Sequence, residues 1–119
     1  LAQAAENSLE RMTFEIQNAK EVETAQSTFG TSPGTLTVSN DAVTRTFSVS
    51  GGQIRVSENG TDAGPLSPTD VSVESLTFTH YTNVHTEAVR ISLSLHIDGR
   101  YASTTKTFTT LAVLRNAYE

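Results

Sequence analysis

Histidine is the first residue type here that could do chemistry, because a neutral imidazole binds zinc and an imidazole also transfers protons near neutral pH. The histidines are His80, His85 and His96. His80 and His85 flank a predicted turn over 81–86 and could approach each other, with Glu87 as the nearest carboxylate. A zinc site needs three or four ligands. We therefore favour the alternative, polar histidines at strand edges, and predict no metal site.

Segment 58–62 is the second candidate, because Glu58, Asn59 and Asp62 supply the oxygen ligands that calcium prefers. It lacks the regularly spaced carboxylates of known calcium-binding loops. Asn59-Gly60-Thr61 is also a glycosylation sequon, a triplet that arises readily by chance. We predict a surface loop over 58–69 that holds no cofactor.

Nucleophilic chemistry has no sequence support. Cysteine is absent, which removes disulfides, thiol nucleophiles and cysteine-ligated zinc together. No serine lies in a Gly-x-Ser-x-Gly elbow, and no glycine-rich phosphate-binding loop follows a strand and opens a helix. The sequence therefore predicts no catalytic residues and a protein that is not an enzyme.

The overall charge restricts the class of partner. The 119 residues include 8 Lys+Arg and 13 Asp+Glu, a formal net charge of -5. An acidic chain does not fit a nucleic-acid groove, which needs a basic face. The length suits one domain with one core, over 1–119. No stretch within the sequence is long and apolar enough to span a bilayer.

The N-terminal segment 1–25 is the one long helical pattern in the sequence. We therefore expect this helix to position the residues that carry the function. It contains neither Gly nor Pro over its first 25 residues, and its apolar residues recur on one side. We predict that this stripe packs against a sheet. The stripe, within a sector of about 80°, consists of Leu1, Ala5, Leu9, Met12, Ile16 and Ala19.

The opposite face of this helix carries Phe14, on the side of Glu10 and Gln17. A large aromatic residue there is either a stray exposed side chain or part of a second contact surface. Leu1 stands where an N-cap residue such as Ser or Asp would be expected. We expect the helix to have continued upstream of Leu1.

Segment 34–116 has the period-two alternation of antiparallel strands. Gly51-Gly52 and Asp98-Gly99 are two-residue hairpin signals, and a slip of the alternation at Glu74-Ser75 predicts a β-bulge. The predicted fold class is α+β, with a long N-terminal amphipathic helix packed on one antiparallel β-sheet. The expected strands are 35–39, 43–49, 53–57, 71–80, 87–97 and 102–115.

This layout resembles the soluble part of type IV pilins and pseudopilins. Segment 8–19, Ser8-Leu9-Glu10-Arg11-Met12-Thr13-Phe14-Glu15-Ile16-Gln17-Asn18-Ala19, looks like the exposed half of the helix in minor pilin-like proteins. Segments 71–78 and 87–93 look like strands of that group. The family's processing site, its glutamate near the mature N-terminus and its apolar half-helix are not in this sequence, and the disulfide common in the family is missing.

The resemblance implies a structural subunit of a type IV pilus-like or type II secretion pseudopilus-like filament. Its partners would be other pilin-like subunits and the inner-membrane assembly machinery, with a membrane anchor preceding Leu1 and a cell-surface location after assembly. The helix would contact neighbouring subunits through Glu10, Phe14 and Gln17, and its own sheet through Leu9, Met12, Ile16 and Ala19. The alternative is a free-standing extracellular β-module for adhesion or carbohydrate binding, which explains the Ser/Thr-rich strands but not the long helix.

Overall fold

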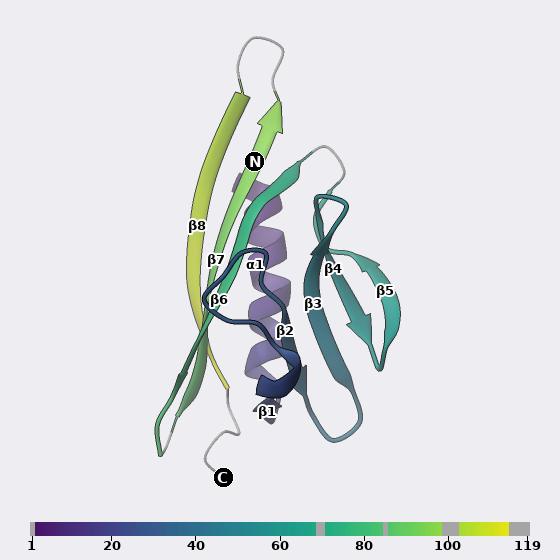
Figure 1. Ribbon diagram of the computed structural model, residues 1–119, viewed down its shortest axis with the longest axis vertical. Coiled ribbons are helices and arrows are strands. Elements are labelled where there is room, and N and C mark those ends of the chain that lie inside the picture. The colour runs from purple at the N-terminus through teal and green to yellow at the C-terminus, as the bar shows by residue number, and fades with distance from the viewer. Residues whose placement is uncertain (1, 69–70, 85, 99–102, 115–119) are drawn as a thin grey trace.

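Antiparallel strands dominate the computed structural model, which describes residues 2–68, 71–84, 86–98 and 103–114 (Figure 1). The two helical elements are α1 (Ala2–Gln17) and the short 3-10 helix η1 (Thr24–Gln26). The strands are β1 (Glu21–Val22), β2 (Leu36–Ser39), β3 (Thr44–Ser50), β4 (Gln53–Glu58), β5 (Thr61–Pro65), β6 (Ser72–Thr82), β7 (Glu87–Asp98) and β8 (Ser103–Val113).

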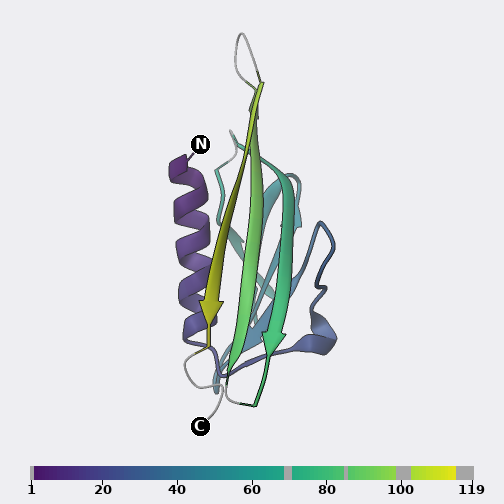
Figure 2. The ribbon, with the colours of Figure 1, turned by 90° about the vertical axis from the view of Figure 1, so that its left-hand side faces the viewer.

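These strands form two separate sheets. The five-stranded sheet has the order β1-β2-β3-β4-β5, and the three-stranded sheet has the order β6-β7-β8. Neighbouring strands in both sheets are antiparallel. Figure 2 shows α1 beside β8, along one side of the molecule, while Figure 1 shows β3, β4 and β5 on the other side of α1 from the three-stranded sheet.

One apolar core joins the helix and both sheets. Burying these side chains is the main stabilising contribution, at about 25 cal/mol for each Å² removed from water. Its largest fully buried members come from all three layers: Met12 and Ile16 from α1, Leu36, Phe47 and Ile54 from the five-stranded sheet, and Leu76, Phe78, Val89, Ile91, Leu93 and Leu95 from the three-stranded sheet.

The predicted fold class, a long helix packed on one sheet, is wrong. The protein is mostly β, with two antiparallel sheets and a helix of 16 residues, about 24 Å long. The alternation of apolar and polar residues along a strand predicts which side chains share a face. It does not predict which strands pair with one another. Two apolar faces can be buried by packing two sheets toward each other, and this chain does so.

The helix predicted over 1–25 ends at Gln17 because the following residues bond elsewhere. The backbone N–H of Asn18 and its side-chain amide both donate to the carbonyl of Phe14, at 3.1 Å and 2.8 Å, which closes the last turn of the helix. Lys20 N–H then donates to Ser39 C=O, and Glu23 N–H to Thr37 C=O, both at 2.8 Å. The chain after α1 therefore becomes an edge strand, against its helical propensity.

The predicted surface loop over 58–69 is also wrong, since β4 extends to Glu58 and β5 follows after a short turn. Asn59, with φ 52°, and Gly60, with φ 86°, supply the turn. Two local predictions are confirmed. Gly51-Gly52 forms a two-residue turn between the paired residues Ser50 and Gln53, and β6 changes register between Val73 and Ser75. The turn predicted at Asp98-Gly99 involves residues outside the described ones.

Candidate functional site

An open groove of about 500 Å³ lies between α1 and β8 and is the best candidate for a functional site. Figure 2 shows the two elements that line it, α1 and β8, side by side. A concave surface with apolar and polar groups is the usual form of a binding site. Its lining residues are Glu6, Leu9, Glu10, Thr13, Phe14 and Gln17 of α1 with Thr109 and Thr110 of β8.

The helix forms one wall of the groove because it has two distinct faces. Ser8, Met12 and Ile16 are fully buried, whereas Phe14 is 60% exposed. Side chains three and four residues apart share a helix face, which places Phe14 next to Glu10 and Gln17. The sequence-predicted contact residues Glu10, Phe14 and Gln17 therefore all line one groove.

The predicted core stripe lies on the other face, with one exception. Met12 and Ile16 of α1 are buried in the core, and so is Ala19, which follows the end of the helix at Gln17. Leu9 packs partly against that core and also lines the groove. Leu9 therefore belongs to both surfaces, at the boundary between the helix's inner and outer faces.

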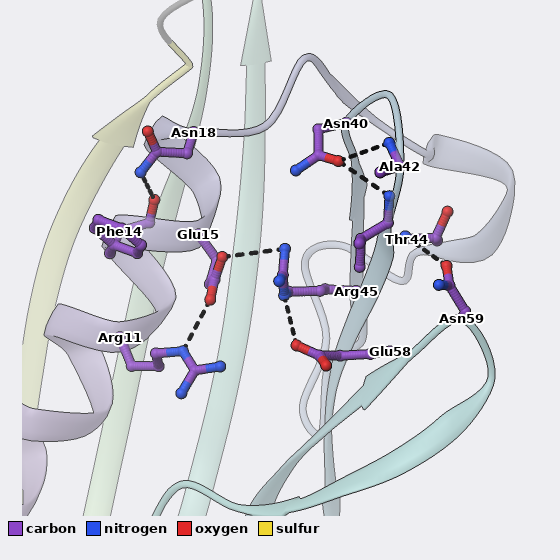
Figure 3. Close-up of polar contacts among 11 residues, drawn as sticks. Arg11, Phe14, Glu15, Asn18, Asn40, Ala42, Thr44, Arg45, Glu58 and Asn59 are labelled. Carbon is purple, nitrogen blue, oxygen red and sulfur yellow. Dashed lines mark hydrogen bonds and ion pairs between the residues drawn. The ribbon is translucent and has the colours of Figure 1, made fainter.

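A network of ion pairs fixes the orientation of α1 (Figure 3). Glu15, whose side chain is 9% exposed, contacts Arg11 Nε at 2.9 Å and Arg45 Nη1 at 3.3 Å. Arg45 Nε continues to Glu58 at 2.8 Å, so the network joins α1 to β3 and β4. In Figure 3, Glu15 points toward Arg45 while Phe14 lies on the opposite side of the helix, nearer to β8. The network thus keeps Phe14 turned toward the groove.

The second wall is the free edge of β8. Leu114 N–H donates to Glu87 C=O at 2.9 Å, and the β7–β8 pairing continues without a shift from Val113–Ala88 to Ser103–Asp98. Residues of an antiparallel strand alternate between bonding to the neighbour and facing away from it. The backbone groups of Thr107, Thr109 and Leu111 therefore face away from β7, toward the open edge.

Charge in the groove has one sign. Its lining includes the carboxylates of Glu6 and Glu10, both exposed, and no lysine or arginine. Arg11, the nearest cation in sequence, is engaged with Glu15. Apolar contact area comes from Phe14 and Leu9. The groove can therefore hold a segment that is partly apolar and basic.

Sequence reasoning missed the contribution of β8. Thr109 and Thr110 line the groove, and Leu111 and Val113 nearby are 54% and 42% exposed. The alternation in this last strand did not show which side faces inward, because threonines occupy both faces. Glu6 was missed as well, although its position four residues before Glu10 was a usable signal.

The histidines do not gather into a metal site in the described part of the chain. His80 Nε2 lies 2.6 Å from Glu87 Oε2, and the ring of Phe29 stacks on His80 with centroids 5.1 Å apart. His96 Nδ1 lies 2.6 Å from Thr105 Oγ1. His85 is outside the described residues. Among those described, no cluster of three His, Asp or Glu residues could hold a metal ion.

The carboxylates of the candidate calcium segment are engaged by arginines. Arg55 Nη2 contacts Asp62 Oδ2 at 2.6 Å, and Arg45 contacts Glu58. The hydrogen bond from Arg55, followed by that from the Gly64 backbone N–H, holds the pKa of Asp62 below its ordinary value. Binding calcium would require breaking both ion pairs.

Metal removal should accordingly leave this protein unaffected. Treatment with EDTA is expected to shift the melting temperature by less than about 1 °C, because a bound metal stabilises the folded state and its loss lowers that temperature. A clear fall that calcium restores would point to the 58–62 segment. A fall that zinc restores would point to the histidines.

Comparison with protein-family models, with curated proteins and with solved structures gives no match. Neither helix in the described residues has the length and apolar character needed to cross a membrane.

Proposed function

We propose that this chain is a structural subunit of a type IV pilus-like or type II secretion pseudopilus-like filament, and that it contacts neighbouring subunits through the outer face of α1. The observation that carries the proposal is Phe14, which is 60% exposed on a helix whose other face is fully buried. Large aromatic residues often dominate the binding energy of protein interfaces.

The fixed orientation of α1 supports this role. The ion pair of Glu15 with Arg45 of β3 links the helix to the five-stranded sheet, so Phe14 cannot turn inward without breaking it. Such a presented face, meeting a different surface on the next subunit, produces open helical polymers. The mostly-β, two-sheet architecture does not contribute to the proposal, which rests on the helix face alone.

In this proposal the partners are other pilin-like subunits and the inner-membrane assembly machinery. A membrane-spanning segment encoded before Leu1 would hold the subunit until assembly places it at the cell surface. About 20 apolar codons behind a basic leader would support the proposal, since that length spans a bilayer. A cleavable signal peptide or another domain at that place would count against it.

The assembly experiment uses Phe14→Glu, which adds a charge where the proposed contact needs an apolar ring. We expect surface filaments to fall at least about tenfold, as for loss of an interface hot spot, while the subunit level in the membrane stays constant. Thr24→Glu, an equal charge change at an exposed site on η1, is the matched control and should assemble normally. Normal assembly of Phe14→Glu would contradict the proposal.

A second candidate, a free-standing extracellular binding module, is favoured by the outer face of the three-stranded sheet. Hydroxyl side chains lie in register across it, with Thr77 opposite Ser92 and Ser92 opposite Thr109. Arg90 lies over the Tyr81 ring at 6.0 Å. A polar sheet with an aromatic residue suits a carbohydrate surface. Binding of the chain to a glycan, abolished by Tyr81→Ala and unaffected by Phe14→Glu, would support this candidate.

A further inference from the structure

The sheet edges of this protein are protected unequally. An open edge presents unpaired backbone groups, and proteins usually guard it with short strands, proline, bulges, charges or a covering segment. At one edge of the five-stranded sheet, β1 has only two residues. At the other edge, β5 has five residues, which include Gly64 and Pro65, and its pairing with β4 contains a register shift. Both edges are guarded in this way.

The β6 edge of the three-stranded sheet is covered by the loop at 29–34. Gly30 N–H donates to Phe78 C=O at 2.9 Å, and Gly34 N–H donates to Leu76 C=O at 2.7 Å. Leu76 N–H in turn donates to Ser32 Oγ at 3.1 Å. These three bonds occupy backbone groups of Leu76 and Phe78, so a further strand could not pair with the middle of β6.

The β8 edge has only one of these protections in the described residues, the charged side chain of Lys106. Its 11 residues pair with β7 without a bulge and include no proline and one charge, Lys106. Leu111 and Val113 are exposed apolar side chains on this strand. The outward backbone groups of Thr107, Thr109 and Leu111 have no partner among the hydrogen bonds of the described chain.

The outer face of α1, beside this edge, carries side chains whose spacing along the helix is close to that of alternate residues in a strand. Glu6, Glu10 and Phe14 follow one another at intervals of four residues, about 6 Å along the helix axis. Alternate residues of an extended strand repeat at about 6.7 Å. Three alternate side chains of a strand lying in the groove would therefore meet Glu6, Glu10 and Phe14 in turn.

We propose that β8 accepts an extended, basic segment of a partner protein as an added antiparallel strand, lying in the groove between β8 and α1. Figure 2 shows β8 running in the same direction as α1, so an antiparallel segment would run opposite to the helix. Read from its N-terminus, the segment would place an apolar residue against Phe14, and then basic residues opposite Glu10 and Glu6. Its pattern is apolar-x-basic-x-basic.

The partner is another protein and not a second copy of this chain. The eight Lys and Arg residues of the sequence never occur two positions apart, so no segment within these 119 residues has the required pattern. The net charge of -5 also opposes self-association at a face that already carries two carboxylates. This inference rests on the proposed function in one respect, since both use the groove between α1 and β8. Strand addition can nevertheless be measured on the isolated chain, without a filament.

The probe is a capped nine-residue peptide that carries one valine followed at alternate positions by two lysines, with threonines elsewhere. On adding it to the 119-residue chain, we expect slower amide hydrogen exchange at Thr107, Thr109 and Leu111, whose N–H groups the peptide would cover. The double variant Glu6→Gln/Glu10→Gln should bind about fivefold to tenfold more weakly at low salt, as expected for two exposed ion pairs.

Backbone pairing is tested separately from charge. A peptide N-methylated at the amides that face β8 should lose binding at least tenfold, although its charge is unchanged, because each methyl removes a donor. Thr109→Pro removes an outward N–H from β8 and should weaken binding similarly, with Thr109→Ala as its control. If Thr109→Pro does not fold, the N-methylated peptide still decides the same point.

Protection away from β8, or equal binding of the methylated peptide, would overturn strand addition. Undiminished binding by the glutamine double variant would overturn the basic pattern. If the peptide binds and the Phe14→Glu variant assembles normally, strand addition is supported and the filament proposal is contradicted. If the peptide does not bind and the Phe14→Glu variant fails to assemble, strand addition is contradicted and the filament proposal is supported.

Discussion

Replacing Ile16 by alanine should destabilise the protein by about 2–5 kcal/mol, the cost typical of truncating a buried aliphatic side chain. Ile16 is fully buried where α1 meets the core of both sheets. Its truncation would leave a cavity in the core that the helix shares with both sheets. The melting temperature should fall by roughly 8 °C or more.

Denaturant unfolding monitored by circular dichroism measures this loss, and Gln17→Ala is the neighbouring control. Gln17 lies on the outer face, so its truncation should change the free energy of unfolding by less than about 0.5 kcal/mol. Leu9→Ala should fall between the two, because Leu9 is half-buried. A loss below about 1 kcal/mol for Ile16→Ala would contradict the packing of α1 described above.

Phe47→Ala should cost about 3–5 kcal/mol and should weaken both sheets together. Phe47 belongs to β3 of the five-stranded sheet and is fully buried in the core that also contains Leu93 of the three-stranded sheet. Because the two sheets share one core, loss of packing on one side removes contacts from the other. We therefore expect a single unfolding transition at a lower denaturant concentration.

Hydrogen exchange at the β7 amides, together with the unfolding curve, provides the measurement. The matched control is Phe14→Ala, the same truncation at a side chain that is 60% exposed, which should cost less than about 0.5 kcal/mol. Two separate transitions, or full protection of β7 in Phe47→Ala, would show that the sheets are stabilised independently.

Several features followed from the sequence because they depend on residues close together in the chain. The two faces of the helix follow from the spacing of Met12 and Ile16 on one side and Phe14 on the other. The turn at Gly51-Gly52 follows from the positive φ angles that glycine adopts without strain, here 61° and 77°. The bulge at Glu74 was visible as a slip in the alternation of a single strand.

Other features depended on partners distant in sequence. The helix ends at Gln17 because Ser39 and Thr37, about 20 residues away, accept hydrogen bonds from Lys20 and Glu23. Segment 61–65 reads as a polar loop, yet it becomes β5 because β4 offers it an edge. A backbone bond between distant segments leaves no periodic mark in either of them, so these pairings could not be predicted locally.

In the candidate site, too, some features depend on residues close together in the chain and others on distant segments. The sequence by itself determined that Glu10, Phe14 and Gln17 share the outer face of a helix, because 3.6 residues per turn bring them together. Only the tertiary structure decided that β8 lies beside that face and that its edge stays open while the loop at 29–34 covers β6. The physical reason is that strand order and edge protection are set by hydrogen bonds across the fold, whereas a helix face is set within a few turns of the chain.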